Sequence, residues 1–282
     1  MKKLCDLHTH SYYSDGTASP SEIIDLAVKN GISAVALSDH NTVGGVREFI
    51  NYASQMGVEA VGGCEISTEY KSIELHVLAL FIPENKYDTV TEFLKPMLER
   101  KLESNRILVE NLNKGGYDVD FDKLVAESPE GHFNRANIAG DLVKKGYVEN
   151  VKQAFSSILS KTAGFYNPPK RIDSFEAIEF IKGIGAVPVL AHPFLDLNEG
   201  QLREFLSVAV GHGLCGMETK YASFSDEESA LASKIAKEFG VLESGGSDFH
   251  GAIRPGVTVG LGRGNLQIPY EFYLNLRNVQ KN

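Results

Sequence analysis

The chain alternates between short apolar runs and longer segments in which apolar residues recur every three or four positions. Short runs of this kind are typical of buried strands, and the longer spacing is typical of amphipathic helices. The expected strands lie at residues 4–7, 32–38, 58–61, 75–82, 186–191, 214–218 and 241–244. The expected helices lie at residues 19–31, 43–56, 174–183, 200–211 and 225–239. This alternation predicts an α/β protein made of βαβ units around a parallel sheet or barrel.

The first expected helix carries start and stop signals. Ser19 is a suitable cap, and Pro20 occupies the first helical position, where its missing N–H costs nothing. Glu22 completes a capping box with Ser19. Gly31 is expected to end the helix.

Residues 83–169 interrupt the alternation, because they carry long helical patterns and few β-branched runs. Pro83 opens this segment, and Pro168 and Pro169 close it. The alternation of strands and helices then resumes. We therefore expect one α/β domain formed by residues 1–82 and 170–282, with residues 83–169 inserted as a helical cap.

Composition and charge restrict the possible partners. Lys and Arg number 28 against 37 for Asp and Glu, a net charge of −9. Modules that bind duplex DNA usually carry a basic face, so such a partner is not expected. No window approaches the roughly 18 uncharged apolar residues of a membrane span, and the N-terminus does not form a signal peptide. Cys5, Cys64 and Cys215 each lie in an apolar run, which favours buried thiols in a reducing cytoplasm.

Most polar residues suited to catalysis follow directly after an expected strand. In an α/β barrel the C-terminal ends of the strands form the catalytic face. Residues far apart in the sequence are therefore expected to meet at one rim. They are His8, His10, Asp39, His40, Glu65, His192, Asp248 and His250.

A metal centre is the chemistry that these residue types favour. His8 and His10 project to the same side of an extended segment, where both can bind one ion. Nitrogen and oxygen ligands without thiolate suit Zn, Mn or Fe. The candidates exceed what one ion needs, which predicts two or three divalent ions. The candidate ligands are His8, His10, Asp15, His40, Glu65, His76, His192, Asp248 and His250.

Two of these positions, and Asp39 beside them, have alternative interpretations. Asp39 is a helix cap, a metal ligand, or a residue that orients His40. His76 lies inside an apolar run, where a buried structural histidine is normal, but its place on a strand directed at the rim favours a ligand. Asp15 precedes Gly16 and is either a turn residue or a ligand.

Six motifs follow one another along nearly the whole chain: DLHTHSYYSDGT, LSDHNT, GCEIS, ELHVLAL, LAHP and GGSDFHG. This ordered set resembles the PHP (polymerase and histidinol phosphatase) superfamily of metal-dependent phosphoesterases. The resemblance implies a distorted (β/α)7 TIM-like barrel with a trinuclear site. By that resemblance one ion is held by His8, His10, Glu65 and Asp248, a second by Glu65, His76 and His192, and a third by Asp15, His40 and His250.

The inserted segment contains His132-Phe133-Asn134-Arg135, which resembles the arginine-bearing helix start of stand-alone PHP phosphatases that act on nucleotides. That group includes nucleoside 3′,5′-bisphosphate phosphatases, AMP-releasing enzymes and 5′ to 3′ exoribonucleases. Their commoner pattern is Arg-Pro-His-Ile-Ala, whereas this chain has Arg-Ala-Asn-Ile-Ala. A guanidinium can hold a phosphate by two hydrogen bonds. Arg135, with Asn134 and Arg171, is therefore expected to bind substrate, the alternative for Arg135 being a surface ion pair.

The resemblance implies a hydrolase that cleaves a phosphate monoester with a metal-activated water. The expected substrate is a nucleoside 3′,5′-bisphosphate, an AMP-type nucleotide or a short 5′-phosphorylated RNA. Asp15, His192 and His250 are the candidate catalytic residues, and either imidazole is a candidate acid for the leaving oxygen. The alternatives are a histidinol-phosphate phosphatase, an amidohydrolase, and a non-catalytic nucleotide or metal sensor.

Overall fold

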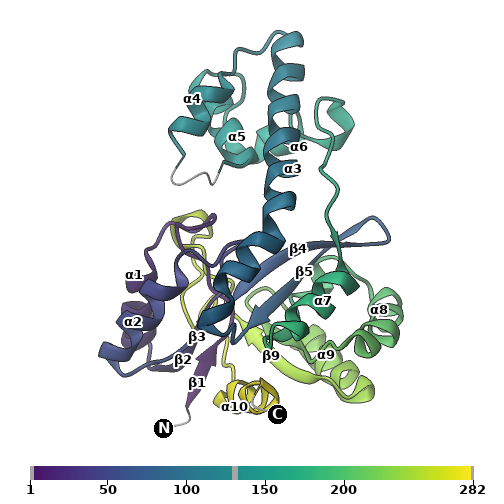
Figure 1. The fold of residues 1–282 in the computed structure, drawn as a ribbon. Helices are drawn as coiled ribbons and strands as arrows, with labels where there is room; N and C mark the ends of the chain where they lie inside the picture. The colour runs from purple at the N-terminus through teal and green to yellow at the C-terminus, as the bar shows by residue number, and fades with distance from the viewer. Residues whose placement is uncertain (1–2, 129–132, 281–282) are drawn as a thin grey trace. The chain divides into compact units, whose positions relative to one another are not determined.

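The computed structural model describes residues 3–128 and 133–280 (Figure 1). The chain forms two compact units, each with its own hydrophobic core. The first unit comprises Met1–Thr91 and Ile172–Asn282, and the second comprises Glu92–Arg171. Within the described residues, no helix is both long enough and apolar enough to cross a bilayer.

The first unit begins with a three-stranded parallel sheet of strands β1 (Leu4–Asp6), β2 (Ile32–Leu37) and β3 (Glu59–Gly62). Helices α1 (Pro20–Lys29) and α2 (Val46–Met56) connect these strands. The capping box at the start of α1 is confirmed, because the Ser19 hydroxyl accepts from the Glu22 amide and the Glu22 carboxylate accepts from the Ser19 amide.

A second, six-stranded sheet has the order β6-β4-β5-β7-β8-β9. Its strands are β4 (Cys64–Tyr70), β5 (Ile73–Leu80), β6 (Ile172–Asp173), β7 (Val187–Leu190), β8 (Gly216–Tyr221) and β9 (Leu242–Gly246). Strands β7, β8 and β9 are parallel, as predicted. Strand β5 is antiparallel to both β4 and β7, so the prediction of a wholly parallel sheet is wrong.

The antiparallel pairing comes from a tight hairpin between β4 and β5. Lys71 and Ser72 connect the two strands and adopt φ values of 50° and 65°. Two successive residues with positive φ form the kind of turn that matches the twist of a hairpin. Asn-Gly or Asp-Gly is the usual signal for such a turn, and Lys-Ser does not carry it. The sequence pattern therefore predicted no strand at β4.

Backbone hydrogen bonds connect the two sheets on both sides. At one edge the Leu7 amide donates to the Gly245 carbonyl at 3.0 Å, and the Asp248 amide donates to the His8 carbonyl at 2.9 Å. At the other, the Gly63 amide donates to the carbonyl of Leu37 at 2.9 Å. The C-terminal ends of β1, β2 and β9 and the first residues of β4 consequently lie close together.

Four longer helices complete the first unit: α7 (Ser174–Gly183), α8 (Glu199–His212), α9 (Asp226–Phe239) and α10 (Tyr270–Gln280). Helix α7 packs on β4, β5 and β7, and α9 packs on β8. Short 3-10 turns are η1 (Glu84–Lys86), η4 (Pro193–Leu195) and η5 (Gly251–Ile253). The core contains side chains from β1, β2, β5, β7 and α10.

The second unit is helical. Helix α3 (Tyr87–Lys114) begins in the first unit and continues into the second, followed by α4 (Phe121–Ala126), α5 (Arg135–Lys144), α6 (Val151–Ser156) and the 3-10 turn η3 (Lys161–Ala163). Its core includes Leu108, Leu112, Ile138 and Leu142, all fully buried.

The junction of β1 and β9 requires a very close backbone approach. A Cβ atom on Gly246 would lie 2.1 Å from the Cβ of His8 and 2.8 Å from its amide nitrogen. Next to it, the buried carboxylate of Asp6 accepts the Ser247 amide at 2.9 Å, the Ser247 hydroxyl at 2.6 Å and the Gly260 amide at 2.6 Å. Only glycine at position 246 permits this contact.

Gly246→Ala is therefore expected to lower the free energy of unfolding by about 1–3 kcal/mol, the usual cost of forcing atoms into a packed interior. Urea denaturation followed by circular dichroism measures the loss. Gly211→Ala is the matched control, because a Cβ there meets nothing within 4 Å, and α8 should gain up to about 1 kcal/mol. Equal stability of the Gly246→Ala chain and the wild type would contradict the close approach.

Candidate metal centre

The predicted ligands converge at the ends of strands in the first unit. Among the described residues, histidine, aspartate and glutamate side chains form four groups whose ligand atoms lie within 4.8 Å of one another. Together these groups contain all nine candidates: His8, His10, Asp15, His40, Glu65, His76, His192, Asp248 and His250. Their sequence positions span almost the full length of the first unit, so the fold alone brings them together.

One oxygen of Glu65 faces three imidazoles. Glu65 Oε2 lies 3.2 Å from His8 Nε2, 3.2 Å from His10 Nε2 and 3.0 Å from His40 Nδ1. The Glu65 side chain is only 1% exposed. It belongs to β4, as the second residue of that strand, and not to the end of the preceding strand as predicted.

The other oxygen of Glu65 faces two more imidazoles. Glu65 Oε1 lies 2.9 Å from His76 Nδ1 and 3.1 Å from His192 Nε2. His76 is on β5, beside β4 in the hairpin, and His192 follows β7. Glu65 therefore lies between two groups of nitrogen atoms, one at each oxygen.

The carboxylates of Asp15 and Asp248 form a second cluster of contacts with imidazoles. His250 Nε2 is 3.1 Å from Asp15 Oδ1, and His40 Nε2 is 3.9 Å from Asp15 Oδ2. Asp248 Oδ1 lies 3.2 Å from His10 Nε2 and 3.3 Å from His250 Nδ1. Asp15 is the most exposed of these carboxylates, at 40% of its side chain.

Several buried polar atoms at the centre lack a hydrogen bond. Among the described residues, Glu65 Oε2, His40 Nδ1 and His192 Nδ1 have no hydrogen-bonding partner. Glu65 Oε2 and His40 Nδ1 are only 3.0 Å apart, yet their orientation is not that of a hydrogen bond. A buried acceptor without a partner is costly unless a cation binds it. The donor set, all nitrogen and oxygen, fits a divalent metal ion.

Mutual charges shift the pKa values of the carboxyl groups. Burial alone would raise the pKa of Glu65, but the surrounding imidazoles, with His8 and His76 carrying the positive charge, hold it well below the usual range. The pKa of Asp248 is likewise lowered, by His8 and His10 against the effect of burial. These carboxylates are therefore ionised at neutral pH.

The pKa values of the imidazoles shift in both directions. Burial would lower the pKa of His10, yet its close contacts with the carboxylates of Asp248 and Glu65 raise it to about 9. For His76, the charge of Glu65 likewise outweighs burial and raises the pKa to about 10. The pKa of His8 is raised well above its usual value in the same way. For His40 burial prevails, and its pKa falls to about 3.

A buried glutamate that the sequence analysis did not select holds two of the histidines. Glu218 Oε1 lies 3.2 Å from His8 Nδ1, and Glu218 Oε2 accepts the backbone amide of His192 at 2.7 Å. A carboxylate on the far nitrogen of a ligand histidine fixes the ring orientation and tautomer. Glu218 ends the strand predicted at 214–218, so the strand-end argument that selected the other residues applies to it equally.

Asp39 accepts hydrogen bonds from the loop that follows β1. Asp39 Oδ1 accepts the Ser11 amide at 2.8 Å and the Ser14 hydroxyl at 2.7 Å, and Oδ2 accepts the Ser11 hydroxyl at 2.7 Å. Helix α2 is capped by Gly45 instead, so the interpretation of Asp39 as a helix cap is wrong. Asp39 orders the loop that carries His10 and Asp15.

Two further side chains that the sequence did not indicate contact Asp248. The Tyr221 hydroxyl donates to Asp248 Oδ2 at 2.6 Å, and Arg254 Nη1 donates to the same oxygen. The backbone of Asp248 has a φ of 53°, and that of His192 has a φ of 26°. Such strained conformations outside glycine concentrate at functional sites, where surrounding contacts hold them in place.

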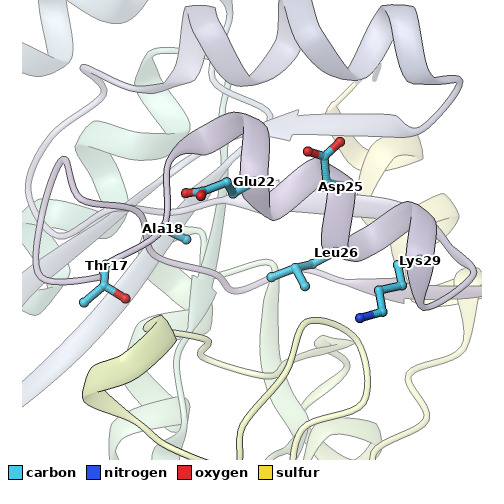
Figure 2. A pocket seen from close by; sticks show the side chains of 6 residues that line it. All are labelled: Thr17, Ala18, Glu22, Asp25, Leu26 and Lys29. Atoms are coloured by element: carbon cyan, nitrogen blue, oxygen red, sulfur yellow. The ribbon is translucent and has the colours of Figure 1, made fainter.

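The centre opens into a cavity of about 190 Å³. The cavity is lined by His40, Glu65, Glu74, His76, His192, Leu195, Asp196, Asp248 and Arg254. A larger hollow of about 390 Å³ lies at α1 and the loop before it. Figure 2 shows that its side chains, among them Glu22, Asp25 and Lys29, do not converge on one point, and none is an imidazole. The cavity at the histidines is therefore the site of chemical interest.

The predicted substrate-binding residues belong to the second unit. Arg135 is the first residue of α5, and its guanidinium lies 4.0 Å from the centroid of the Tyr166 ring. Asn134 caps this helix, because its side chain accepts the Ala136 amide at 2.7 Å. Arg171 is the last residue of the unit and is partly exposed. His132 lies outside the described residues.

Comparisons with known proteins agree on one family. A model described as PHP domain matches residues 6–166. The chain is 31% identical over 253 residues to a 5′-3′ exoribonuclease of Haemophilus influenzae, covering 89% of this chain and 91% of the relative. It is 29% identical over 258 residues to a 3′,5′-nucleoside bisphosphate phosphatase of Chromobacterium violaceum, covering 90% of each. A solved structure described as a metal-dependent phosphoesterase of Bifidobacterium adolescentis matches with a TM-score of 0.84 and 26% identity, covering 98% of this chain and 96% of that one.

Metal binding at this centre is expected to release protons. Because the pKa values of His10 and His76 are raised to about 9 and about 10, these groups hold protons at pH 7 in the metal-free protein, and a ligand imidazole must be neutral. Titration with Mn²⁺ at pH 7 should therefore release up to about two protons per chain, and affinity should fall as the pH is lowered from 8 to 6. Calorimetry in two buffers of different ionisation enthalpy counts the protons. Binding with no proton release would contradict the protonated state.

Proposed function

Because the chain belongs to the PHP domain family and is a hydrolase of phosphoric esters, we propose that it removes phosphate from a nucleotide with the help of two or three divalent ions. The observation that carries this proposal is the convergence of nine nitrogen and oxygen ligands around Glu65 and Asp248. Mn, Zn and Fe are the ions that this donor set favours.

The contacts support a division of the ligands among three ions. The first would be held by His8, His10, Glu65 and Asp248, the second by Glu65, His76 and His192, and the third by Asp15, His40 and His250. Glu65 would bridge the first two, since each of its oxygens faces a different group of imidazoles. We also infer that the two sheets close into a distorted (β/α)7 barrel, which the hydrogen bonds joining β1 to β9 and β2 to β4 support.

When bound, ions at such a centre lower the pKa of water and offset charge on the phosphoryl oxygens. The chain itself supplies orientation and proton transfer. Asp15 is 40% exposed and lies 3.1 Å from His250, so a substrate can reach this pair from the Asp15 side, and the pair is our first candidate to transfer a proton to the leaving oxygen. His192 is the second, and Glu218 fixes its backbone.

Arg135 is the proposed contact for a substrate phosphate. No ion pair joins it to a carboxylate in the described part of the chain, and its guanidinium stacks on Tyr166. It also stands at the N-terminus of α5, where helix amides favour an anion. The two curated relatives act, by their names, on RNA and on a nucleoside bisphosphate, which favours a nucleotide substrate over histidinol phosphate. Short RNA is the second candidate, because the exoribonuclease shares 31% identity over nearly the whole chain.

Phosphate release from four compounds, assayed side by side with Mn²⁺, tests the proposal. The compounds are adenosine 3′,5′-bisphosphate, AMP, histidinol phosphate and a short 5′-phosphorylated RNA. We expect release from the bisphosphate or AMP to exceed release from histidinol phosphate. A preference for the RNA would select the exoribonuclease branch. No release from any compound, with Mn²⁺ bound, would overturn the proposal in favour of a sensor.

Two variants control for the metal centre in this assay. Glu65→Gln and Asp248→Asn remove a ligand charge while keeping the side-chain shape. Each should lower kcat by at least about 100-fold, since even changes to the groups that orient metal ligands cost 10- to 100-fold. Circular dichroism should show a retained fold. Undiminished turnover in both variants would contradict the ligand assignment.

Arg135→Ala is expected to raise KM about tenfold to 100-fold, the range for losing charge-assisted hydrogen bonds to a phosphate. Metal content, measured by mass spectrometry, should stay near that of the wild type. Lys152→Ala, which removes a charge from α6 in the same unit, is the control and should leave KM unchanged. An unchanged KM in Arg135→Ala would move the phosphate contact elsewhere.

A further inference from the structure

Arg254 is the one lysine or arginine among the described residues that line the metal-centre cavity. It follows the short turn η5, and 42% of its side chain is exposed. The same lining contains four carboxylates, those of Glu65, Glu74, Asp196 and Asp248. An anionic substrate entering this cavity meets strong negative charge, and Arg254 is the only fixed cation that the lining offers against it.

The guanidinium of Arg254 is only partly used by the protein. Nη1 donates to Asp248 Oδ2 and to the Tyr221 hydroxyl at 3.1 Å, and it lies 3.5 Å from the Asp248 carbonyl oxygen. A guanidinium has five N–H donors, so Nε and Nη2 carry three more. No residue in the described part of the chain accepts from them.

We propose that Arg254 binds the phosphoryl group of the substrate through Nε and Nη2 while Nη1 stays on Asp248. This inference rests on the proposed function. Two parallel N–H groups match two phosphate oxygens, a geometry that a lysine ammonium lacks. The contact of Nη1 with the Asp248 carboxylate holds the side chain in place beforehand, so less conformational entropy is lost when phosphate binds.

The rival explanation is that Arg254 only orients Asp248. Tyr221 distinguishes the orienting role from the phosphate-binding role. Its hydroxyl donates to the same oxygen, Asp248 Oδ2, but Tyr221 is not among the residues lining the cavity. A purely orienting role predicts that losing either partner of Asp248 has similar consequences. A phosphate-binding role predicts that only the loss of Arg254 weakens phosphate affinity.

The test measures inorganic phosphate binding to the Mn²⁺-loaded protein by calorimetry, together with Mn²⁺ content by mass spectrometry. Arg254→Gln should raise the Kd for phosphate about tenfold to 100-fold with Mn²⁺ content near the wild-type value. Arg254→Lys keeps a charge beside Asp248 and should retain Mn²⁺ but recover little phosphate affinity. Tyr221→Phe should leave the Kd for phosphate within about twofold of the wild type.

Arg203→Gln is the control for removing an arginine, because its guanidinium pairs with Glu199 and Glu238 and does not line the cavity. An unchanged phosphate Kd in both Arg254 variants would overturn the inference. So would equal losses of Mn²⁺ and phosphate affinity in Arg254→Gln and Tyr221→Phe. If the wild type binds phosphate through Arg254 yet hydrolyses none of the four esters, the proposed function fails, and what is left of the inference is Arg254 as a phosphate-binding residue.

Discussion

A carboxylate removed from water must be surrounded by protons or cations, and Glu65 imposes this requirement on the metal centre. Its side chain is 1% exposed, and five imidazole nitrogens approach its two oxygens within 3.2 Å. The imidazoles come from both sheets, so the requirement can be met only when the two sheets are joined. The position of Glu65 at the start of β4, bridged to His40, places it at that junction.

Other buried carboxylates hold the chain in the conformation that the centre needs. Asp6 accepts two amides and a hydroxyl from the segments around β9, and Asp39 orders the loop after β1. Glu218 holds the ring of His8 and the backbone of His192. These contacts stabilise backbone conformations that are otherwise unfavourable, such as the positive φ of His192 and Asp248. The precision of the centre thus depends on a second layer of residues without a metal-ligand role of their own.

The acidic character of the chain is compatible with an anionic substrate. A net charge of −9 repels phosphate at long range, but local charges decide binding at close range. In the proposed reaction the ions and the guanidinium of Arg254 would reverse the sign of the potential inside a cavity that is otherwise lined with carboxylates. In the metal-free protein the same carboxylates raise the pKa values of the buried imidazoles, because a protonated imidazole offsets their negative charge.

The sequence by itself determined the features that depend on local patterns. Apolar periodicity located helices α1, α2, α7, α8 and α9 and strands β1, β2, β3, β7, β8 and β9 to within a few residues, and the capping box at Ser19 marked the start of α1. It did not predict α10 or the two-residue strand β6, which is parallel to β4. Polar residues after successive strands identified the groups that converge, because parallel strands end at a common edge. Glu218 also ends a predicted strand, at 214–218, so the same argument applies to it.

Only the tertiary structure decided the features that depend on contacts between distant segments. The β4–β5 hairpin is connected by Lys71 and Ser72, which have positive φ values although their residue types are not typical of such a turn. Its antiparallel pairing could therefore not be inferred from the sequence. The partnership of Arg254 and Tyr221 with Asp248 joins loops and strands with no shared local pattern. The close approach at Gly246 likewise exists only once β1 lies beside β9. Periodicity reports which face of an element is buried, whereas the identity of its neighbour is set by packing of the whole chain.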